Sequence, residues 1–313
     1  MSEIVVTENL TKKYSGFIAL DNLNLKIEEN TCVGFLGPNG AGKSTTIKIL
    51  TGLLHPSSGK AFIAGKDVTK QTRFALSGVG IVQENPQFFP KLTPEEILLY
   101  FGKLRGMEKN ELVNRIDEVL DLVKMLEWKK KKIETFSKGM NQRFALASAL
   151  LHDPMLIILD EPTLGLDPRG IIEIIEIIKE LKKQGKTIFM SSHILSEVQE
   201  VCDKIALIDK GKLKIYDSVE RIGHEKKTSK INVEIINSLT TTQTSLIQKF
   251  DGVKGIKQES KSSFVVEFLG TDEERARLLD DIQKTGVKVV SFKPLKSNLE
   301  SLYMDTTSTE SSE

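Results

Sequence analysis

The chain has 313 residues, a formal net charge of +1, and 39% hydrophobic and 28% charged residues. This length is about that of two typical domains, and the composition is that of a folded globular protein, so wholesale disorder is excluded. The balanced charge disfavours a nucleic-acid partner bound through bulk basicity, and no apolar run approaches the roughly 18 residues of a membrane span. Two cysteines, Cys32 and Cys202, are too few for a disulfide framework or a four-thiolate zinc site.

Short apolar strands alternate with amphipathic helices over residues 1–220, which predicts an α/β domain. The expected strands are Ile4–Leu10, Leu23–Ile27, Thr31–Leu36, Ala61–Ala64, Val79–Gln83, Met155–Leu159, Thr187–Met190 and Lys204–Ile208. Residues 156–159 are continuously apolar, as in a central parallel strand that is covered on both faces. Between Pro94 and Leu126 the apolar residues follow a helical spacing, so we expect a helical subdomain over about residues 90–152.

A polar stretch at 221–230 is expected to be a linker, and the order of elements changes after it. The expected elements are strands at Ile231–Ile235, Val253–Gln258, Phe264–Phe268 and Val287–Phe292, with helices at Thr242–Phe250 and Asp272–Lys284. This βαββαβ order predicts a small ferredoxin-like α+β accessory domain over residues 231–304. A short helix is expected at Ser297–Tyr303, and residues 305–313 are expected to form a disordered tail.

The strand Thr31–Leu36 runs directly into a glycine-rich segment that fits the pattern GxxxxGK[ST]. The segment is formed by Gly37, Pro38, Asn39, Gly40, Ala41, Gly42, Lys43, Ser44 and Thr45. Its glycines allow a tight loop whose backbone N–H groups face an anion, while Lys43 reaches the β- and γ-phosphates and Ser44 offers a hydroxyl to Mg²⁺. The sequence therefore predicts nucleotide binding. The loop by itself does not separate a transporter ATPase from a GTPase or a small-molecule kinase.

Two acids, Asp160 and Glu161, follow the buried strand Met155–Leu159. In a doubly wound sheet ligands bind beyond the carboxyl ends of the strands, so both acids are expected to face the same nucleotide. Neighbouring side chains at a strand end diverge. One acid can therefore hold Mg²⁺ through water while the other polarises the attacking water.

A third motif, FSKGMNQR, opens a helix for which Ser137 is a good N-cap. No acid between Lys138 and His152 complements the helix dipole, and the side chains of Lys138 and Arg143 oppose it. This arrangement suits an anion that arrives from outside. Taken alone, the segment fits an ordinary capped helix equally well.

These motifs occur in one order with Gly165-Leu166-Asp167 and Ser192-His193, and here the chain resembles the ATP-binding subunits of ABC transporters over residues 1 to about 217. The resemblance implies a P-loop NTPase core with a mostly parallel sheet, an antiparallel β part and a helical subdomain. It also implies ATP and Mg²⁺ as cofactors and the hydrolysis of ATP to ADP and phosphate.

The resemblance further implies roles for individual residues around the chain's own nucleotide. Tyr14 would stack on the adenine ring. Gln83 would contact Mg²⁺ and water and sense the transmembrane partner. Asp160 would lie on the Mg²⁺ side, Glu161 would be the general base and His193 the switch histidine.

Other residues would act across the interface between two subunits. By the same resemblance, Ser137 and Gly139 would bind the γ-phosphate held by the opposite subunit, and Asp167 would be an inter-subunit loop acid. The segment FSKGM departs from the common LSGGQ at its first, third and fifth positions, and Lys138 adds a positive charge near the triphosphate. These departures are typical of the ATPases of ABC-2-type exporters and of multidrug or antibiotic efflux systems.

As a whole, the resemblance implies a head-to-tail homodimer in the ATP-bound state, located peripherally on the cytoplasmic side of the cell membrane. Separately encoded transmembrane permease subunits would dock on Glu84–Leu104. An alternative is an ABC ATPase that acts on a non-transport machine, such as the ribosome, DNA or metal-cluster assembly. A regulator that binds nucleotide without hydrolysis is disfavoured because Glu161 and His193 are both present.

Overall fold

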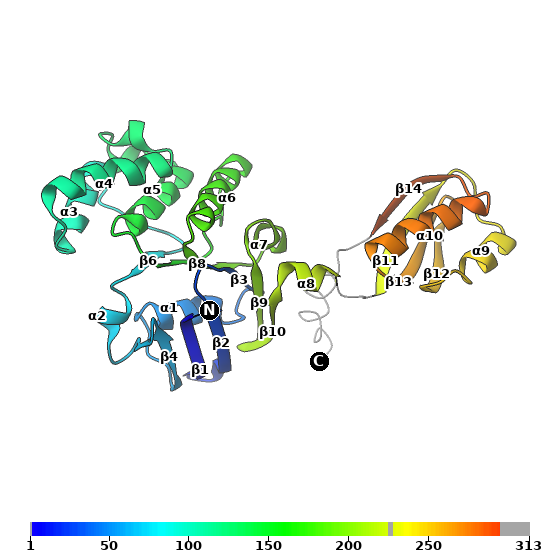
Figure 1. Cartoon of the computed structure of the whole chain (residues 1–313), viewed down its shortest axis with the longest axis horizontal. Helices are drawn as coiled ribbons and strands as arrows, with labels where there is room; N and C mark the ends of the chain where they lie inside the picture. Colours follow the sequence, from blue (N-terminus) through cyan, green and yellow to red (C-terminus); the bar gives the residue numbers. More distant parts are fainter. Residues whose placement is uncertain (1, 225–227, 295–313) are drawn as a thin grey trace. The chain divides into compact units, whose positions relative to one another are not determined.

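The computed structural model describes residues 2–224 and 228–294, which fall into two units, Met1–Asp217 and Ser218–Glu313 (Figure 1). Each unit has a hydrophobic core of its own. Among the described residues, no helix is both long and apolar enough to cross a membrane.

A six-stranded sheet forms the centre of the first unit, with the strand order β10-β9-β3-β8-β7-β6. Its strands are β3 (Cys32–Leu36), β6 (Val79–Val82), β7 (Leu156–Leu159), β8 (Thr187–Ser192), β9 (Lys204–Asp209) and β10 (Lys212–Ser218). The pairs β9–β3, β3–β8, β8–β7 and β7–β6 are all parallel. Leu36 pairs with Ser192, and Leu159 pairs with Met190, so β3, β7 and β8 end side by side. The residues that follow these strands therefore meet at one edge of the sheet.

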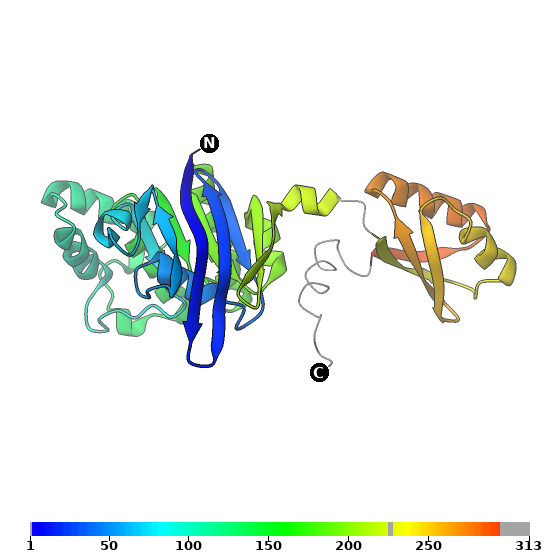
Figure 2. The same ribbon diagram turned by 90° about the horizontal axis from the view of Figure 1, so that it is seen from below.

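An antiparallel sheet with the order β2-β1-β4-β5 packs on the first sheet, and the two share one core. Its strands are β1 (Glu3–Tyr14), β2 (Phe17–Glu28), β4 (Ser58–Ile63) and β5 (Lys66–Asp67), and Figure 2 shows β1 and β2 as a long hairpin. In the chain, the helix α1 (Lys43–Leu50) lies between β3 and β4, and the helix α2 (Thr72–Ala75) follows β5.

The helical subdomain lies between β6 and β7 in the chain and forms one group in Figure 1. It contains α3 (Pro94–Leu104), α4 (Lys109–Leu122), two short 3₁₀ helices (Leu126–Trp128 and Ile133–Thr135) and α5 (Lys138–Leu150). Thr93 and Glu96 form a reciprocal capping box that fixes the start of α3. Two further helices follow β7 and β8, α6 (Pro168–Lys183) and α7 (Leu195–Val201).

The second unit has a ferredoxin-like core, as the order of elements predicted. After α8 (Val219–His224) it contains β11 (Thr228–Ile235), α9 (Thr241–Ile247), β12 (Val253–Ser260), β13 (Ser263–Leu269), α10 (Asp272–Lys284) and β14 (Val289–Pro294). The four strands are antiparallel in the order β12-β13-β11-β14. Apolar residues of α9 and α10, including Ile247 and Ile282, share a core with Val233 and Phe264 of the sheet.

The stretch expected to be a linker is largely occupied by regular elements. Residues 221–224 belong to α8 and residues 228–230 to β11, while 225–227 lie outside the described residues. The polar composition of the stretch hid the buried side chain of Ile222, which is 4% exposed. The expected helix Ser297–Tyr303 and the expected tail at 305–313 also lie outside the described residues.

Candidate functional site

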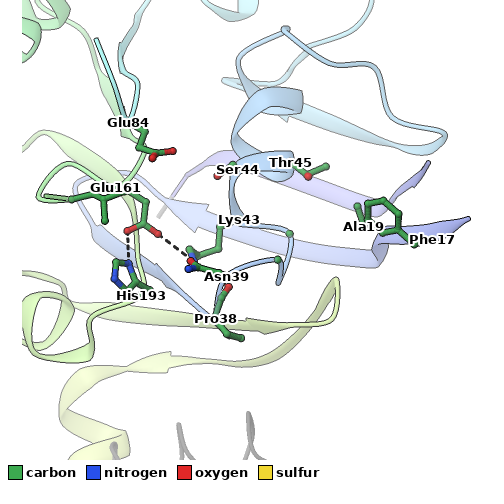
Figure 3. A pocket seen from close by; sticks show the side chains of 13 residues that line it. Phe17, Ala19, Pro38, Asn39, Lys43, Ser44, Thr45, Glu84, Glu161 and His193 are labelled. Carbon is green, nitrogen blue, oxygen red and sulfur yellow. Dashed lines mark hydrogen bonds and ion pairs between the residues drawn. The ribbon is translucent and has the colours of Figure 1, made fainter. Parts of the chain in front are cut away.

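A cavity of about 470 Å³ lies where the phosphate loop meets the segments that follow β7 and β8 (Figure 3). It is lined by Pro38, Asn39, Gly40, Gly42, Lys43, Ser44 and Thr45 of the loop and by Phe17, Ala19, Glu84, Glu161, Leu164 and His193. The cavity has a charged end, where Lys43, Glu161 and His193 meet, and an apolar end formed by Phe17 and Ala19.

The phosphate loop turns into α1 at Gly42, whose φ of +109° lies in the left-handed region. A β-carbon at this position would lie 2.7 Å from the carbonyl oxygen of Ala19, so the turn needs glycine for conformation and for space. The first turn of α1 contains no acid. Its free N–H groups and the positive end of the helix dipole are therefore available to an anion in the cavity.

Lys43 is 5% exposed, and its ammonium is held inside the loop. Nζ donates to the carbonyl oxygens of Gly37 at 2.6 Å and Pro38 at 3.2 Å, and it lies 3.2 Å from Oε1 of Glu161. These neutral and anionic oxygens are the kind of partner that a phosphate oxygen can replace.

Glu161 lies between Lys43 and His193. Its Oε2 atom is 2.8 Å from Nδ1 of His193, so that nitrogen carries its proton toward the carboxylate. The backbone of Glu161 has φ +48°, a strained conformation for a residue with a side chain. Its N–H is held in place by a 2.9 Å hydrogen bond to Oγ of Ser191, the residue in β8 that lies two before His193. Strain of this kind collects at functional sites, where the surrounding structure enforces it.

Asp160 follows β7 directly, precedes Glu161 and is 7% exposed. Burial raises the pKa of its carboxyl group above the usual range, and the negative charges of Glu161 and Glu84 act in the same direction. The hydrogen bond that Ser191 Oγ donates to Oδ1 at 2.8 Å opposes the shift in pKa. Two acidic neighbours therefore disfavour ionised Asp160 while the charge of Lys48 favours it, and a further cation beside Asp160 would favour it as well.

A second cavity, of about 420 Å³, lies at the start of α5. Three residues predicted for the site line it, namely Ser137, Gly139 and Asp167, and none of them lines the first cavity. Ser137 caps α5 by accepting from the N–H of Met140 at 3.2 Å, and Asp167 caps α6 by accepting from that of Gly170 at 2.8 Å. Lys138, Arg143 and Arg169 add three cations to this cavity, and Glu173 pairs with both arginines.

Comparison with known proteins agrees with this geometry. A family described as ABC transporter matches residues 20–164. The uncharacterized ABC transporter ATP-binding protein YhcH of Bacillus subtilis is 39% identical over 86% of this chain and 88% of its own length. The bacitracin transport ATP-binding protein BcrA of Bacillus licheniformis is 46% identical over 68% of this chain and 69% of its own. A dimeric ATP-binding cassette solved in a post-hydrolysis state with ADP and Pi superposes with a TM-score of 0.63 at 27% identity, over 69% of this chain and 99% of that one.

This chain belongs to the ABC transporter ATP-binding proteins. It is an ATPase that serves as the ATP-binding subunit of a membrane transporter, and the predicted P-loop NTPase fold is confirmed. Within this ABC ATPase, most of the predicted residues converge. Seven of the nine loop residues line the first cavity together with Glu161 and His193. The carbonyl oxygen of Gly37 accepts from Lys43, while Ala41 and Asp160 are buried.

Two predicted residues, Tyr14 and Gln83, do not line the cavity of this ABC ATPase, whereas residues near them in the sequence do. Tyr14 does not line the cavity but stacks on Phe17, with ring centroids 5.3 Å apart, and Phe17 lines the apolar end. Gln83 is exposed and lies outside the lining, whereas Glu84 faces the cavity near Glu161 (Figure 3). Sequence analysis missed both residues. Only their closeness in the sequence to Tyr14 and Gln83 pointed to Phe17 and Glu84. The direction of a side chain at a strand end depends on the backbone, which the sequence does not give.

Proposed function

We propose that this ABC ATPase powers an exporter whose translocation pathway is formed by separately encoded membrane subunits. The observation that carries the proposal is the meeting of Lys43, Glu161 and His193 at the ends of three parallel strands, beside a phosphate loop. The likeness to a protein named for bacitracin transport, together with the FSKGM segment, favours efflux over nutrient import.

In the proposed reaction, water attacks the γ-phosphorus atom of ATP in line with the leaving ADP. Glu161 accepts a proton from this water, and His193 orients the Glu161 carboxylate through its Nδ1–H. Lys43 moves from the carbonyl and carboxylate oxygens to the β- and γ-phosphates, where it stabilises the charge of the transition state.

Mg²⁺ fits this site. No group of three or more His, Cys, Asp or Glu side chains among the described residues forms a metal cage, which agrees with a cation held largely by phosphates and water. Ser44 and Asp160 would hold the ion, and Glu84 is a better candidate than Gln83 for the third position because it lines the cavity and raises the pKa of Asp160. The bound ion supplies positive charge that offsets the negative charge of the phosphates.

The nucleotide base would lie at the apolar end, against Phe17. The ring of Tyr14 stacks on that of Phe17, and the ammonium of Lys12 lies 5.3 Å from the Tyr14 ring centroid. The second cavity would receive the γ-phosphate of a second copy, which brings together Ser137, Gly139 and the ATP of the opposite chain in a homodimer.

The membrane subunits would dock on α3 and the adjoining edge strand β6, at the membrane's cytoplasmic face. A hollow of about 290 Å³ lies there, lined by Ile81 of β6, by Phe101 and Leu104 of α3, and by Arg105, the C-cap of α3. Leu104 is 69% exposed and extends the apolar surface around the hollow. Glu84 lies two residues after the end of β6, so a partner on this face would contact a segment that also lines the nucleotide cavity.

The test uses the full chain co-expressed with a candidate membrane subunit, chosen as a multi-helix membrane protein whose gene neighbours the gene of this chain, and the candidate carries the affinity tag. We expect capture of the chain in detergent and an ATPase activity that Glu161→Gln abolishes. Leu104→Glu should reduce the capture at least tenfold, whereas the control Val113→Glu, at an exposed apolar residue of α4, should not. Equal capture of both variants would contradict the proposed docking face, and an inactive wild-type chain would contradict the proposed site.

A further inference from the structure

Glu197 is a buried acid on α7 for which the proposed reaction has no use. It is 6% exposed, and its Oε2 atom accepts two hydrogen bonds, from Thr163 Oγ1 at 2.8 Å and from Ser192 Oγ at 2.9 Å. The other oxygen, Oε1, is buried with no hydrogen-bond partner among the described residues. An unpaired buried oxygen destabilises a fold, so the carboxylate contributes little as a stabilising group and calls for another explanation.

The two donors belong to different segments of the site, the loop after β7 and the end of β8. Thr163 follows Glu161 by two residues in the loop after β7, and Ser192 directly precedes His193 at the end of β8. Glu197 therefore joins the backbone segments that carry Glu161 and His193, whose side chains meet at 2.8 Å.

Ser191 joins the same two segments at a second point. Its hydroxyl donates to Oδ1 of Asp160 at 2.8 Å and accepts from the N–H of Glu161 at 2.9 Å. The contact between Glu161 and His193 thus forms where the segments are fixed by two buried polar connections, one through Ser191 and one through Glu197. Of these, only Glu197 lies on a third element.

That third element is fixed to the phosphate-loop strand. Val198 packs so closely on Gly34 of β3 that a β-carbon on Gly34 would lie 2.2 Å from Val198 Cγ1. The helix α7 is therefore tightly packed against β3, the strand that leads into the phosphate loop. Through Glu197 it sets the positions of the loops after β7 and β8 relative to the phosphates.

We propose that Glu197 is a positioning residue for hydrolysis, which holds Glu161 and His193 in register with the phosphate loop without touching substrate. This inference rests on the proposed function and adds to it the residue that fixes the geometry of the base. Misplacement of a catalytic group by about 1 Å lowers a rate by about 10²-fold, and this is the loss in kcat expected for Glu197→Ala.

The hydroxyl of Thr163 offers a sharper test than the acid, because substitutions can separate its shape from its hydrogen bond. Thr163→Val keeps the shape and removes the donor to Glu197, and we expect kcat to fall at least tenfold with the KM for ATP within threefold of wild type. Thr163→Ser keeps the donor and should restore kcat to within threefold. The control Glu200→Gln changes an exposed acid of the same helix, which is paired with Lys179 at 2.7 Å, and should behave as wild type.

The full-length chain is assayed for ATPase and for binding of a fluorescent ATP analogue, with each variant also measured in a His193→Ala background. If Glu197 acts through the pair, Thr163→Val should add less than a twofold loss there. A loss of twofold or more in that background, a raised KM, or wild-type kcat in Thr163→Val and Glu197→Ala would each overturn the proposal. In those cases the wild-type ATPase and its loss in Glu161→Gln would remain, whereas a wild-type chain without ATPase would overturn the proposed function and this inference together.

Discussion

Replacing Glu161 with glutamine is expected to separate ATP binding from ATP hydrolysis. Glutamine keeps the size of the side chain and one oxygen to accept from His193, but it removes the basic carboxylate. A general base contributes about 10²–10⁴-fold to a rate, or roughly 3–5 kcal/mol of the barrier. We therefore expect kcat to fall by a factor in that range.

The same substitution is expected to tighten ATP binding. Lys43 Nζ and Glu161 Oε1 are 3.2 Å apart, and both side chains are almost fully buried. At an effective dielectric constant of about 20, the Coulomb attraction at this distance is about 5 kcal/mol. Most of that attraction offsets the cost of desolvating the pair. A net gain of about 1 kcal/mol remains when Lys43 is released to the phosphates, so the Kd should fall roughly fivefold.

Phosphate release measures the rate, a fluorescent ATP analogue measures Kd, and gel filtration with MgATP measures the ATP-bound dimer that hydrolysis no longer empties. The control is Glu176→Gln, which breaks a surface ion pair with Lys124 of 2.6 Å and should leave all three quantities unchanged. A Glu161→Gln variant with kcat within threefold of wild type would refute the assignment of the base. Weaker ATP binding in that variant would refute the role given to the ion pair.

Three further predictions concern other parts of the chain. Lys43→Ala should abolish turnover and weaken MgATP binding at least tenfold while the circular dichroism spectrum stays that of a folded protein, since the change removes a phosphate contact. Asp160→Asn should raise Tm of the nucleotide-free protein by a few degrees at pH 7. The pKa of Asp160 is higher in the folded than in the unfolded chain, so ionisation of Asp160 destabilises the fold as the pH rises above the unfolded pKa. The gain should vanish at pH values below the unfolded pKa, and an equal gain at all pH values would refute the cause. Truncation after Ser218 should leave ATP affinity within threefold of wild type, as the first unit has a separate core; loss of affinity in a folded product would contradict this.

The charged end of the site could be predicted from sequence because its residues follow strands directly. GxxxxGK[ST] after an apolar strand fixes both the loop and its position at the strand's carboxyl end. The all-apolar segment 156–159 is equally informative, since all four residues of β7 are buried. Lys43, Glu161 and His193 come together because the strands that precede them, β3, β7 and β8, lie side by side in the order β3-β8-β7.

The structure differs from the expected positions where one or two residues decide the direction of a side chain. At the end of a strand, successive side chains point to opposite faces, so a shift of one position separates exposed Gln83 from Glu84 in the cavity. The hairpin of β1 and β2 contains several register irregularities, which sequence periodicity does not reveal, and there Phe17 rather than Tyr14 reaches the cavity.

Other features gave no signal at all. The strand β10 (Lys212–Ser218) was not predicted: only Lys212–Ile215 alternates polar and apolar residues, which is a short signal, and none of the strand's residues is fully buried. Glu197 stands in a helix where an acid is ordinarily a solvated residue, and only the packing of α7 shows that it is buried.

The ion pair between Lys43 and Glu161 sets an order of events in the proposed reaction. Oε1 of Glu161 lies 3.2 Å from Nζ of Lys43 and Oε2 lies 2.8 Å from Nδ1 of His193, so each carboxylate oxygen has a partner of its own. A triphosphate that enters the loop attracts Lys43 more strongly than a single carboxylate does, because it carries several negative charges. Only Oε1 is released by this exchange, and Oε2 stays with His193 and keeps the carboxylate oriented. In the proposed reaction, Oε1 of Glu161 is therefore freed for the attacking water when a phosphate occupies the loop. Lys43 then lies beside the phosphate oxygens, whose negative charge must be stabilised during hydrolysis.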